Sequence, residues 1–280
     1  MRFTKMHGIG NDYVYVNLFE ETVEDESRLA WAISRPHFGV GADGLILIGP
    51  GEEAEFRMTI YNADGSRANM CGNGARCVGK YLYDRGLTHK TEIPLETDSG
   101  IRTLHIETEA GKAKRVTVDM GVPRQTFEEV PCLLGSGPIQ PVQIEACGKI
   151  FSAMPIGMGN PHAVIFLDEP ADNALLSTVG PFLEKHPSFP NGVNVEFARI
   201  LSETSLSMRV WERGSGITLA CGTGASATLV AAVLLRLAKR EAHISLDGGE
   251  LFCCWDKKTN CVFLTGPAVF VFDGEWFGEM

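Results

Sequence analysis

Two cysteines in similar surroundings are the residues of this 280-residue chain best suited to chemistry. Cys71 and Cys221 each begin the motif C-G-x-G-A, and each precedes a segment typical of a helix. At a helix start, unpaired amide hydrogens and the positive end of the helix dipole stabilise a thiolate, so we expect both thiols to ionise more readily than a free thiol. The glycines let a ligand approach the backbone closely, and the exposed amides can hold an anion such as a carboxylate.

The pairing of two such thiols indicates a two-base reaction. A carbon atom held between them could lose a proton to a thiolate on one face and gain one from a thiol on the other, which inverts its configuration. The helix amides would stabilise the charge that develops on the carbanion. Paired helix-start thiols could equally be a redox pair, and the residues alone leave this alternative open.

The two cysteines lie in two copies of one sequence pattern. The segment from Met58, MTIYNADGSRANMCGNGA, aligns without a gap on the segment from Met208, MRVWERGSGITLACGTGA, at an offset of 150 residues. Apolar residues alternate before each motif, which predicts a strand in the same phase in both copies. GIGN, ending at Asn11, matches GMGN, ending at Asn160, at an offset of 149 residues.

The duplication predicts an α+β fold of two pseudo-symmetric halves, each a mostly antiparallel sheet or barrel wrapped around one central helix. Predicted strands outnumber helices, which argues against a doubly wound parallel sheet. We place the N-terminal half at residues 1–119, with a return segment at 267–280, and the C-terminal half at 120–266. Residues 120–149 are rich in Pro and Gly, which is typical of a linker. Matching loops of such halves commonly form a ligand cleft.

Composition excludes several classes of protein. Lys plus Arg number 25 and Asp plus Glu 35, a net charge of −10, so no nucleic-acid partner is expected. Residues 214–235 lack charge, but their first half is rich in Gly, Ser and Thr, so we predict a buried helix and no membrane partner. The chain begins without an apolar signal segment and its eight cysteines contain no C-x-x-C pair. We therefore expect a cytoplasmic protein with free thiols and no metal site, in which the six other cysteines are buried apolar residues.

Two phosphate-binding motifs are matched only in part. Residues 39–44 fit G-x-G-x-x-G, but they lead into a predicted strand and not into a helix. Residues 74–80 spell G-x-x-x-x-G-K, yet Tyr81 stands where a Ser or Thr must meet magnesium. Neither a dinucleotide site nor a phosphate loop is expected.

Six motifs in one order make the whole chain resemble the diaminopimelate epimerase family of pyridoxal-independent amino-acid racemases and epimerases. They are KMHGIGNDYV near the N-terminus, GVGADGLILI from Gly39, YNADGSRANMCGNGARC from Tyr61, GNPHAV from Gly159, NGVNVEF from Asn191 and VWERGSGITLACGTGA from Val210. The resemblance implies an isomerase that interconverts LL- and meso-2,6-diaminopimelate in lysine and peptidoglycan-precursor biosynthesis. It also implies a small amino-acid substrate, no cofactor and a homodimer.

The same resemblance implies roles for individual residues. Cys71 and Cys221 would be the paired acid and base, and His162 and Glu212 would assist proton transfer, with Glu212 also holding an ammonium group. The other implied substrate contacts are Asn11 and Asn62, the amides of Gly72, Asn73, Gly222 and Thr223 for the reacting carboxylate, and Asn160, Asn194 and Arg213 for the distal end of the substrate. One position departs from the pattern, because some family members have Gln where this chain has Gly44.

Side-chain chemistry supports part of this assignment. Arg213 can pair with a carboxylate through two hydrogen bonds, and asparagines offer donors and acceptors without adding charge. Two alternatives remain, namely a racemase that uses the same thiols on another amino acid, such as histidine or proline, and a thiol oxidoreductase or redox sensor. Glu212 and Arg213 could also be an ordinary surface pair, and His162 a structural histidine.

Overall fold

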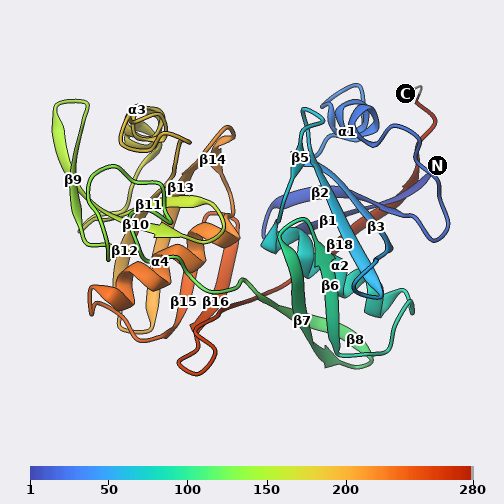
Figure 1. Ribbon diagram of the computed structural model, residues 1–280. Helices are drawn as coiled ribbons and strands as arrows, with labels where there is room; N and C mark the ends of the chain where they lie inside the picture. The colour runs from blue at the N-terminus through green and yellow to red at the C-terminus, as the bar shows by residue number, and fades with distance from the viewer. Residues whose placement is uncertain (279–280) are drawn as a thin grey trace. The chain divides into compact units, whose positions relative to one another are not determined.

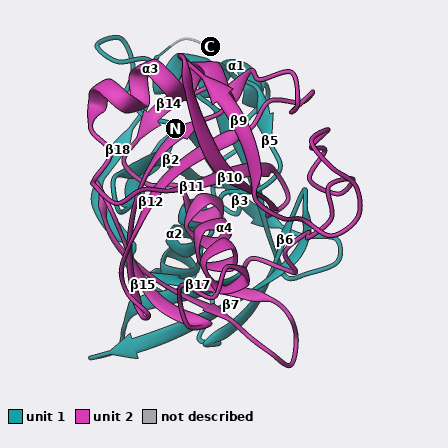
Figure 2. Cartoon of the chain, turned by 90° about the vertical axis from the view of Figure 1, so that its left-hand side faces the viewer, with its two compact units in different colours: residues 1–119, 265–280 teal, residues 120–264 magenta. Residues whose placement is uncertain are grey.

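The computed structural model describes residues 1–278 and divides into two compact units. Unit 1 contains residues 1–119 and the chain from residue 265 onward, and unit 2 contains residues 120–264 (Figure 2). Glu279 and Met280, the end of the return segment expected at 267–280, lie outside the described residues.

Each unit has two helices within residues 1–278. They are α1 (Glu26–Ser34) and α2 (Gly72–Asp84) in unit 1, and α3 (Asn173–Glu184) and α4 (Gly222–Leu234) in unit 2. The sequence predicted α2 and α4, which follow the two C-G-x-G-A motifs, but the prediction of one helix per half missed α1 and α3. Asp25 and Asp172 cap the two missed helices, accepting hydrogen bonds from first-turn amides. Such capping residues are the local signal that marks both starts.

The strands of unit 1 form a mixed sheet in which most pairs are antiparallel (Figure 1). The strands are β1 (Arg2–Gly8), β2 (Asn11–Asn17), β3 (Gly44–Pro50), β4 (Phe56–Asn62), β5 (Arg67–Ala68), β6 (Glu92–Thr97), β7 (Gly100–Glu109), β8 (Lys112–Asp119) and β18 (Val269–Glu275). The pairs β2–β3 and β4–β6 are parallel.

Unit 2 repeats the same pairing pattern. Its strands are β9 (Val142–Ala146), β10 (Lys149–Gly157), β11 (Pro161–Phe166), β12 (Asn194–Ser202), β13 (Ser205–Glu212), β14 (Gly216–Thr218), β15 (Glu241–Leu246) and β16 (Gly249–Trp255), and β17 (Val262–Gly266) crosses the boundary to unit 1. The pairs β11–β12 and β13–β15 are parallel, as β2–β3 and β4–β6 are in unit 1. The expected linker at 120–149 is only partly correct, because β9 lies within it and pairs with β10.

Helix α4 is the centre of unit 2 (Figure 1). It contacts β10, β11, β12, β13, β15 and β16, and residues from Ala225 through Ala232 are buried. A helix that is apolar all round is stable only when strands cover every side, as predicted for this segment.

In unit 1, α2 lies close to β7 and β8 at Gly79. A Cβ added to Gly79 would lie 3.1 Å from atoms of Leu104 and Val116, so the missing side chain allows this close packing.

None of the helices within residues 1–278 is both long and apolar enough to cross a membrane.

All eight cysteines are free thiols, but they differ in exposure. Cys77, Cys132 and Cys253 are buried, as expected of cysteines that serve as small apolar residues. The same expectation was wrong for Cys147, which is exposed in the turn between β9 and β10, and for the half-buried Cys254 and Cys261. Cys253 and Cys254 differ because successive strand residues point to opposite faces.

Truncating one leucine of α4 should destabilise unit 2 far more than truncating another. Leu229 is fully buried, whereas Leu234 at the end of the same helix is 37% exposed. Leu229→Ala leaves a cavity in the core and should lower the free energy of unfolding by about 3 kcal/mol. Leu234→Ala should lower it by less than about 1 kcal/mol. Urea denaturation followed by circular dichroism measures both, and equal losses would contradict a central position of α4.

Candidate functional site

Cys71 and Cys221 occupy the same position at the start of their helices. Each is an N-cap residue in extended conformation, with φ −139° at Cys71 and φ −128° at Cys221. The sulfur of each accepts a hydrogen bond of 3.3 Å from the amide of the third residue along, Gly74 or Gly224. An N-cap side chain satisfies one of the amides that a helix start leaves unpaired. Both thiols therefore lie against the positive end of a helix dipole.

The third residue after each cysteine is glycine, and a strand side chain lies against it. A Cβ at Gly74 would lie 2.5 Å from Ile46 Cδ1, and a Cβ at Gly224 would lie 2.8 Å from Glu196 Oε1. Ile46 and Glu196 occupy matching positions, the third residue of β3 and of β12. Unit 1 thus places the apolar side chain of Ile46 against the start of its helix, and unit 2 places the carboxyl group of Glu196 there.

In unit 1, Asn11 connects Cys71 to a carboxylate. Asn11 Oδ1 accepts hydrogen bonds from the Cys71 thiol (3.4 Å) and from Asn73 Nδ2 (3.3 Å), and Asn11 Nδ2 donates to Asp43 Oδ2 (2.7 Å). A carboxylate only accepts, so Asp43 holds the Asn11 amide with its oxygen toward the thiol. Burial raises the pKa of Asp43, and the nearby Asp12 raises it further. The fully buried Arg76 donates to Asn73 Oδ1 (2.9 Å) and orients that side chain in turn.

Asn62 and Gly44 lie opposite each other in the β3–β4 pair. Asn62 Nδ2 donates to Ser66 Oγ (3.0 Å), so this asparagine belongs to its own turn and not to the network of Asn11 and Cys71. A Cβ at Gly44 would lie 2.1 Å from the carbonyl oxygen of Tyr61 and 2.9 Å from the ring of Tyr13. This backbone therefore has no room for a glutamine side chain at residue 44.

In unit 2, a buried chain of side chains leads to the start of α4. His162 and Glu196 are both fully buried, with His162 Nδ1 2.7 Å from Glu196 Oε1 and His162 Nε2 2.8 Å from Asn160 Oδ1. Asn160 Nδ2 donates to Thr223 Oγ1 (3.4 Å), and this hydroxyl is 3.5 Å from the Cys221 sulfur. Four of the predicted site residues, Asn160, His162, Cys221 and Thr223, are brought together here.

Burial and neighbouring carboxyl groups reverse the expected acidity of Cys221. Burial is the main cause that raises its pKa well above the usual value, and the charges of Glu212 and Glu196 raise it further. Hydrogen bonds from Thr223 and from the amide of Gly224 act in the opposite direction but do not compensate. The prediction of an acidic helix-start thiol is therefore wrong for Cys221, because desolvation outweighs the helix dipole.

Glu212, at the end of β13, is the second carboxyl group beside Cys221. Its Oε1 accepts a hydrogen bond of 2.5 Å from Thr218 Oγ1. Burial raises the pKa of the Glu212 carboxyl, and the charge of Glu196 acts in the same direction. A hydrogen bond with the Cys221 thiol is among the effects that lower it. The carboxyl group of Glu212 therefore loses its proton at a higher pH than that of an exposed glutamate.

Asn194 and Arg213 form a neighbouring pair. Asn194 Oδ1 accepts from the Arg213 amide (3.0 Å), and Asn194 Nδ2 donates to the carbonyl of Pro161 (3.0 Å). The exposed Arg213 guanidinium donates to the carbonyl of Asn191 (2.6 Å). Glu212 and Arg213 therefore bond to different partners, Thr218 and Asn191, which does not fit the alternative of an ordinary surface pair.

Three residues of these networks were missed by sequence reasoning, namely Asp43, Arg76 and Glu196. A signal existed for Glu196, because the offset of 150 residues aligns it with Ile46. A carboxyl group at a position that is apolar in the other copy indicates a polar partner nearby. Asp43 offers no comparable signal, since its partner Asn11 is reached through a tertiary contact. Arg76 lies only three residues after its partner Asn73 in α2, but nothing in the sequence marks it as buried.

No group of three or more His, Cys, Asp or Glu side chains within residues 1–278 is placed to hold a metal ion. The carboxyl groups nearest the two cysteines take part in hydrogen bonds with Asn11, His162 and Thr218.

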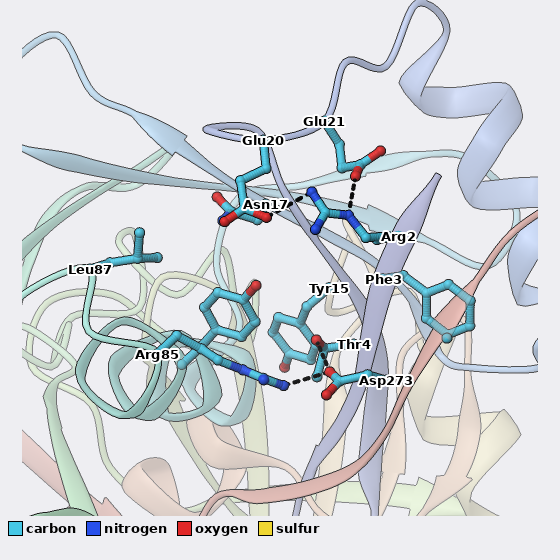
Figure 3. A pocket seen from close by; sticks show the side chains of 12 residues that line it. Arg2, Phe3, Thr4, Tyr15, Asn17, Glu20, Glu21, Arg85, Leu87 and Asp273 are labelled. Atoms are coloured by element: carbon cyan, nitrogen blue, oxygen red, sulfur yellow. Dashed lines mark hydrogen bonds and ion pairs between the residues drawn. The ribbon is translucent and has the colours of Figure 1, made fainter.

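A separate hollow of about 450 Å³ lies in unit 1 and contains none of the predicted site residues. Its charged side chains pair with one another, as Figure 3 shows. Arg2 lies 3.0 Å from Glu20 and 2.9 Å from Glu21, and Arg85 lies 2.5 Å from Asp273. Each of these charged side chains already has a partner within the hollow, where three carboxylates face two guanidinium groups.

Comparison with known proteins gives matches across both units. A family model described as diaminopimelate epimerase matches residues 3–126 and 154–271. The chain is 51% identical over 275 residues to a diaminopimelate epimerase of Acetivibrio thermocellus, with 98% of each chain covered. It is 50% identical over 274 residues to a diaminopimelate epimerase of Parabacteroides distasonis, covering 98% of this chain and 97% of the relative.

Two solved structures share the fold. A probable proline racemase from Agrobacterium radiobacter K84 has a TM-score of 0.74 at 15% identity, covering 98% of this chain and 92% of the other. A hydroxyproline epimerase from Agrobacterium vitis has a TM-score of 0.70 at 16% identity, covering 98% and 91%. These likenesses confirm the predicted α+β fold class. Because the family model covers most of both units and the relatives match nearly end to end, the chain belongs to the diaminopimelate epimerase family.

Proposed function

We propose that this protein interconverts LL- and meso-2,6-diaminopimelate by removing and returning a proton at one α-carbon. One observation carries the proposal, namely that each unit presents a cysteine as the N-cap of the helix that follows its C-G-x-G-A motif. The identity of about one half to named diaminopimelate epimerases supports the choice of substrate. We further propose that the enzyme is a cytoplasmic homodimer in lysine and peptidoglycan-precursor biosynthesis.

Cys71 and Cys221 act as base and acid on opposite faces of the carbon. A thiolate takes the α-proton, the bonding electrons remain on the carbon as a carbanion, and the other thiol donates its proton to the opposite face. The thiol and the thiolate exchange roles, so charge balances over the turnover. The amides of Gly72, Asn73, Gly222 and Thr223 hold the reacting carboxylate, and such donors each supply about 3 kcal/mol of transition-state stabilisation.

The resting enzyme holds its proton on Cys221. Burial and nearby carboxyl groups raise the pKa of this thiol, so Cys221 is the first acid, and Cys71, whose thiol donates to Asn11 Oδ1, acts as the first base once it has given up that proton. Glu212 and His162 assist proton transfer at Cys221, whose surroundings they share. This asymmetry between the copies gives the two thiols different starting roles.

The remaining polar residues bind the two zwitterionic ends of the substrate. Asn11 and Asn62 contact the reacting end, Glu212 holds an ammonium group, and Asn160, Asn194 and Arg213 bind the distal end. The exposed guanidinium of Arg213 is suited to a carboxylate. A racemase of a simple amino acid such as proline would not need this second polar group.

Incubation with LL-diaminopimelate in deuterium oxide tests the proposed function. The epimerase should exchange the α-proton for deuterium, because the returned proton comes from a thiol that equilibrates with solvent. NMR of the α-proton follows the loss of signal and the appearance of the meso form. Exchange with proline or histidine alone would identify the simpler racemase, and turnover of a disulfide without α-exchange would identify an oxidoreductase.

Replacing either catalytic cysteine should stop inversion. Cys71→Ala and Cys221→Ala should each lower kcat by ~10³-fold, because each face of the carbon needs its own proton carrier. Cys147→Ala is the matched control, since this thiol is exposed on a turn, and its kcat should not change. A single catalytic-cysteine mutant with near-normal turnover would rule out the two-base reaction.

Alkylation of Cys221 by iodoacetamide should be slow at neutral pH and accelerate with rising pH. Only the thiolate reacts, so below the pKa the rate should rise about tenfold per pH unit. Glu212→Gln removes a charge that raises the pKa of Cys221, and should therefore increase the rate at a given pH. Glu169→Gln, an exposed change in the same unit, is the control. Peptide mass mapping measures the modification, and an unchanged rate in Glu212→Gln would exclude the carboxylate effect.

A further inference from the structure

Glu184, the last residue of α3, holds two segments that meet at Arg213. Its Oε2 accepts a hydrogen bond of 2.7 Å from Trp211 Nε1, and its Oε1 accepts one of 3.0 Å from the amide of Gly214. An indole N–H and a backbone amide can only donate, so the donor and the acceptor of both contacts are fixed. The backbone carbonyl of Glu184 also accepts from the amide of Val193 (3.1 Å). One residue thus contacts both the turn after β13 and the segment before β12.

Arg213 lies between these contacts. Its own amide donates to Asn194 Oδ1 (3.0 Å), and the amide of the next residue, Gly214, donates to Glu184. Both peptide groups of Arg213 are therefore held. Its guanidinium donates to the carbonyl of Asn191 (2.6 Å), two residues before the amide that the Glu184 carbonyl binds. The backbone and the side chain of Arg213 are thus both connected to Glu184.

Two glycines give room to this arrangement. A Cβ at Gly180, one helical turn before Glu184, would lie 2.5 Å from Trp211 Cγ. Because residues four apart share a helix face, the Trp211 ring lies over Gly180 and its N–H reaches Glu184. A Cβ at Gly192 would lie 2.9 Å from Arg213 Cδ. The side chains of Trp211 and Arg213 therefore each pack against a glycine.

The matching turn of unit 1 is held differently. Tyr61 stands where unit 2 has Trp211, at the offset of 150 residues, and its hydroxyl donates to Glu26 Oε2 in the first turn of α1. The same turn carries Ala63 at the position of Arg213. A bond between an aromatic side chain and a glutamate is thus common to both units. In unit 2, however, the glutamate lies at the other end of its helix, and its second oxygen binds the turn that carries the guanidinium.

We propose that Glu184 is a positioning residue that sets the place of the Arg213 guanidinium, and thereby the recognition of a carboxylate group at the far end of the substrate. The proposal deepens the proposed function, on which it rests. Glu184 acts through the turn that carries Arg213 and not on the reacting carbon.

Loss of the Glu184 side chain should weaken substrate binding more than proton transfer. Glu212, which lies beside Cys221, keeps its own contact with Thr218 Oγ1 and its pairing with Gly216 between β13 and β14. Glu184→Ala removes both acceptor oxygens and keeps the backbone carbonyl. It should raise KM for diaminopimelate about tenfold and change kcat by less than about threefold, because a contact equal in ground state and transition state affects KM alone. A large loss of kcat at unchanged KM would contradict the proposal.

Hydrogen exchange of the Gly214 amide tests the positioning without substrate. In Glu184→Ala this amide loses its acceptor, so its exchange, followed by NMR, should become about tenfold faster. Trp211→Phe removes the indole donor but leaves an oxygen of Glu184 for Gly214, so here the exchange should rise by less than about twofold. Equal exchange in the wild type and in Glu184→Ala would overturn the proposal.

Asp172→Ala is the matched control. Asp172 caps the other end of α3, where its Oδ1 accepts from the amide of Leu175 (2.7 Å). Its loss weakens the same helix without touching the turn that carries Arg213, so KM and the exchange of Gly214 should not change. Changes equal to those in Glu184→Ala would assign Glu184 a merely structural role and overturn the proposal.

A double mutant distinguishes action through Arg213 from an independent effect. Arg213→Met should itself raise KM for diaminopimelate, and adding Glu184→Ala should raise it no further, because both changes remove one contact. Fully additive losses would contradict the proposed path. A wild-type enzyme that leaves diaminopimelate unchanged would refute the proposed function, and the exchange of Gly214 would still decide whether Glu184 holds the turn. Circular dichroism of each variant checks that the fold is retained.

Discussion

The contact between a cysteine sulfur and the third amide of its helix is the constraint on which the rest of the site depends. It holds Cys71 and Cys221 in extended conformation at the positive end of α2 and α4. Glycine at positions 74 and 224 leaves room for a strand side chain against each helix start. Strands, helix and thiol therefore pack together in each unit, so the thiol is positioned by regular secondary structure.

The two copies keep this geometry but differ in charge. Around Cys71 the connected side chains are Asn11 and Asn73, with the buried cation Arg76 behind them. Around Cys221 lie two carboxyl groups, Glu196 and Glu212, which raise the pKa of the thiol beyond the effect of burial. Similar helix starts therefore place their thiols in different electrostatic surroundings.

Sequence patterns predicted the features that arise from neighbouring residues. The helices after both C-G-x-G-A motifs, the alternating strands before them and the mostly antiparallel pairing follow from short-range patterns that the duplication repeats. Helices α1 and α3 were missed, although Asp25 and Asp172 mark their starts, because neither follows a cysteine motif. Strand β9 was also missed, because it lies in a segment whose prolines and glycines indicated a linker.

The sequence by itself determined the family, the duplicated fold and the place of each cysteine at a helix start, because a helix cap is a contact between residues three positions apart. Only the tertiary structure decided how those cysteines behave. The pKa of Cys221 depends on Glu212 and Glu196, and His162 is held by a contact with Glu196, a residue 34 positions away. The absence of a side chain at residue 44 depends on the carbonyl of Tyr61 across the sheet. Desolvation and charge act through space, so no spacing along the chain reveals them.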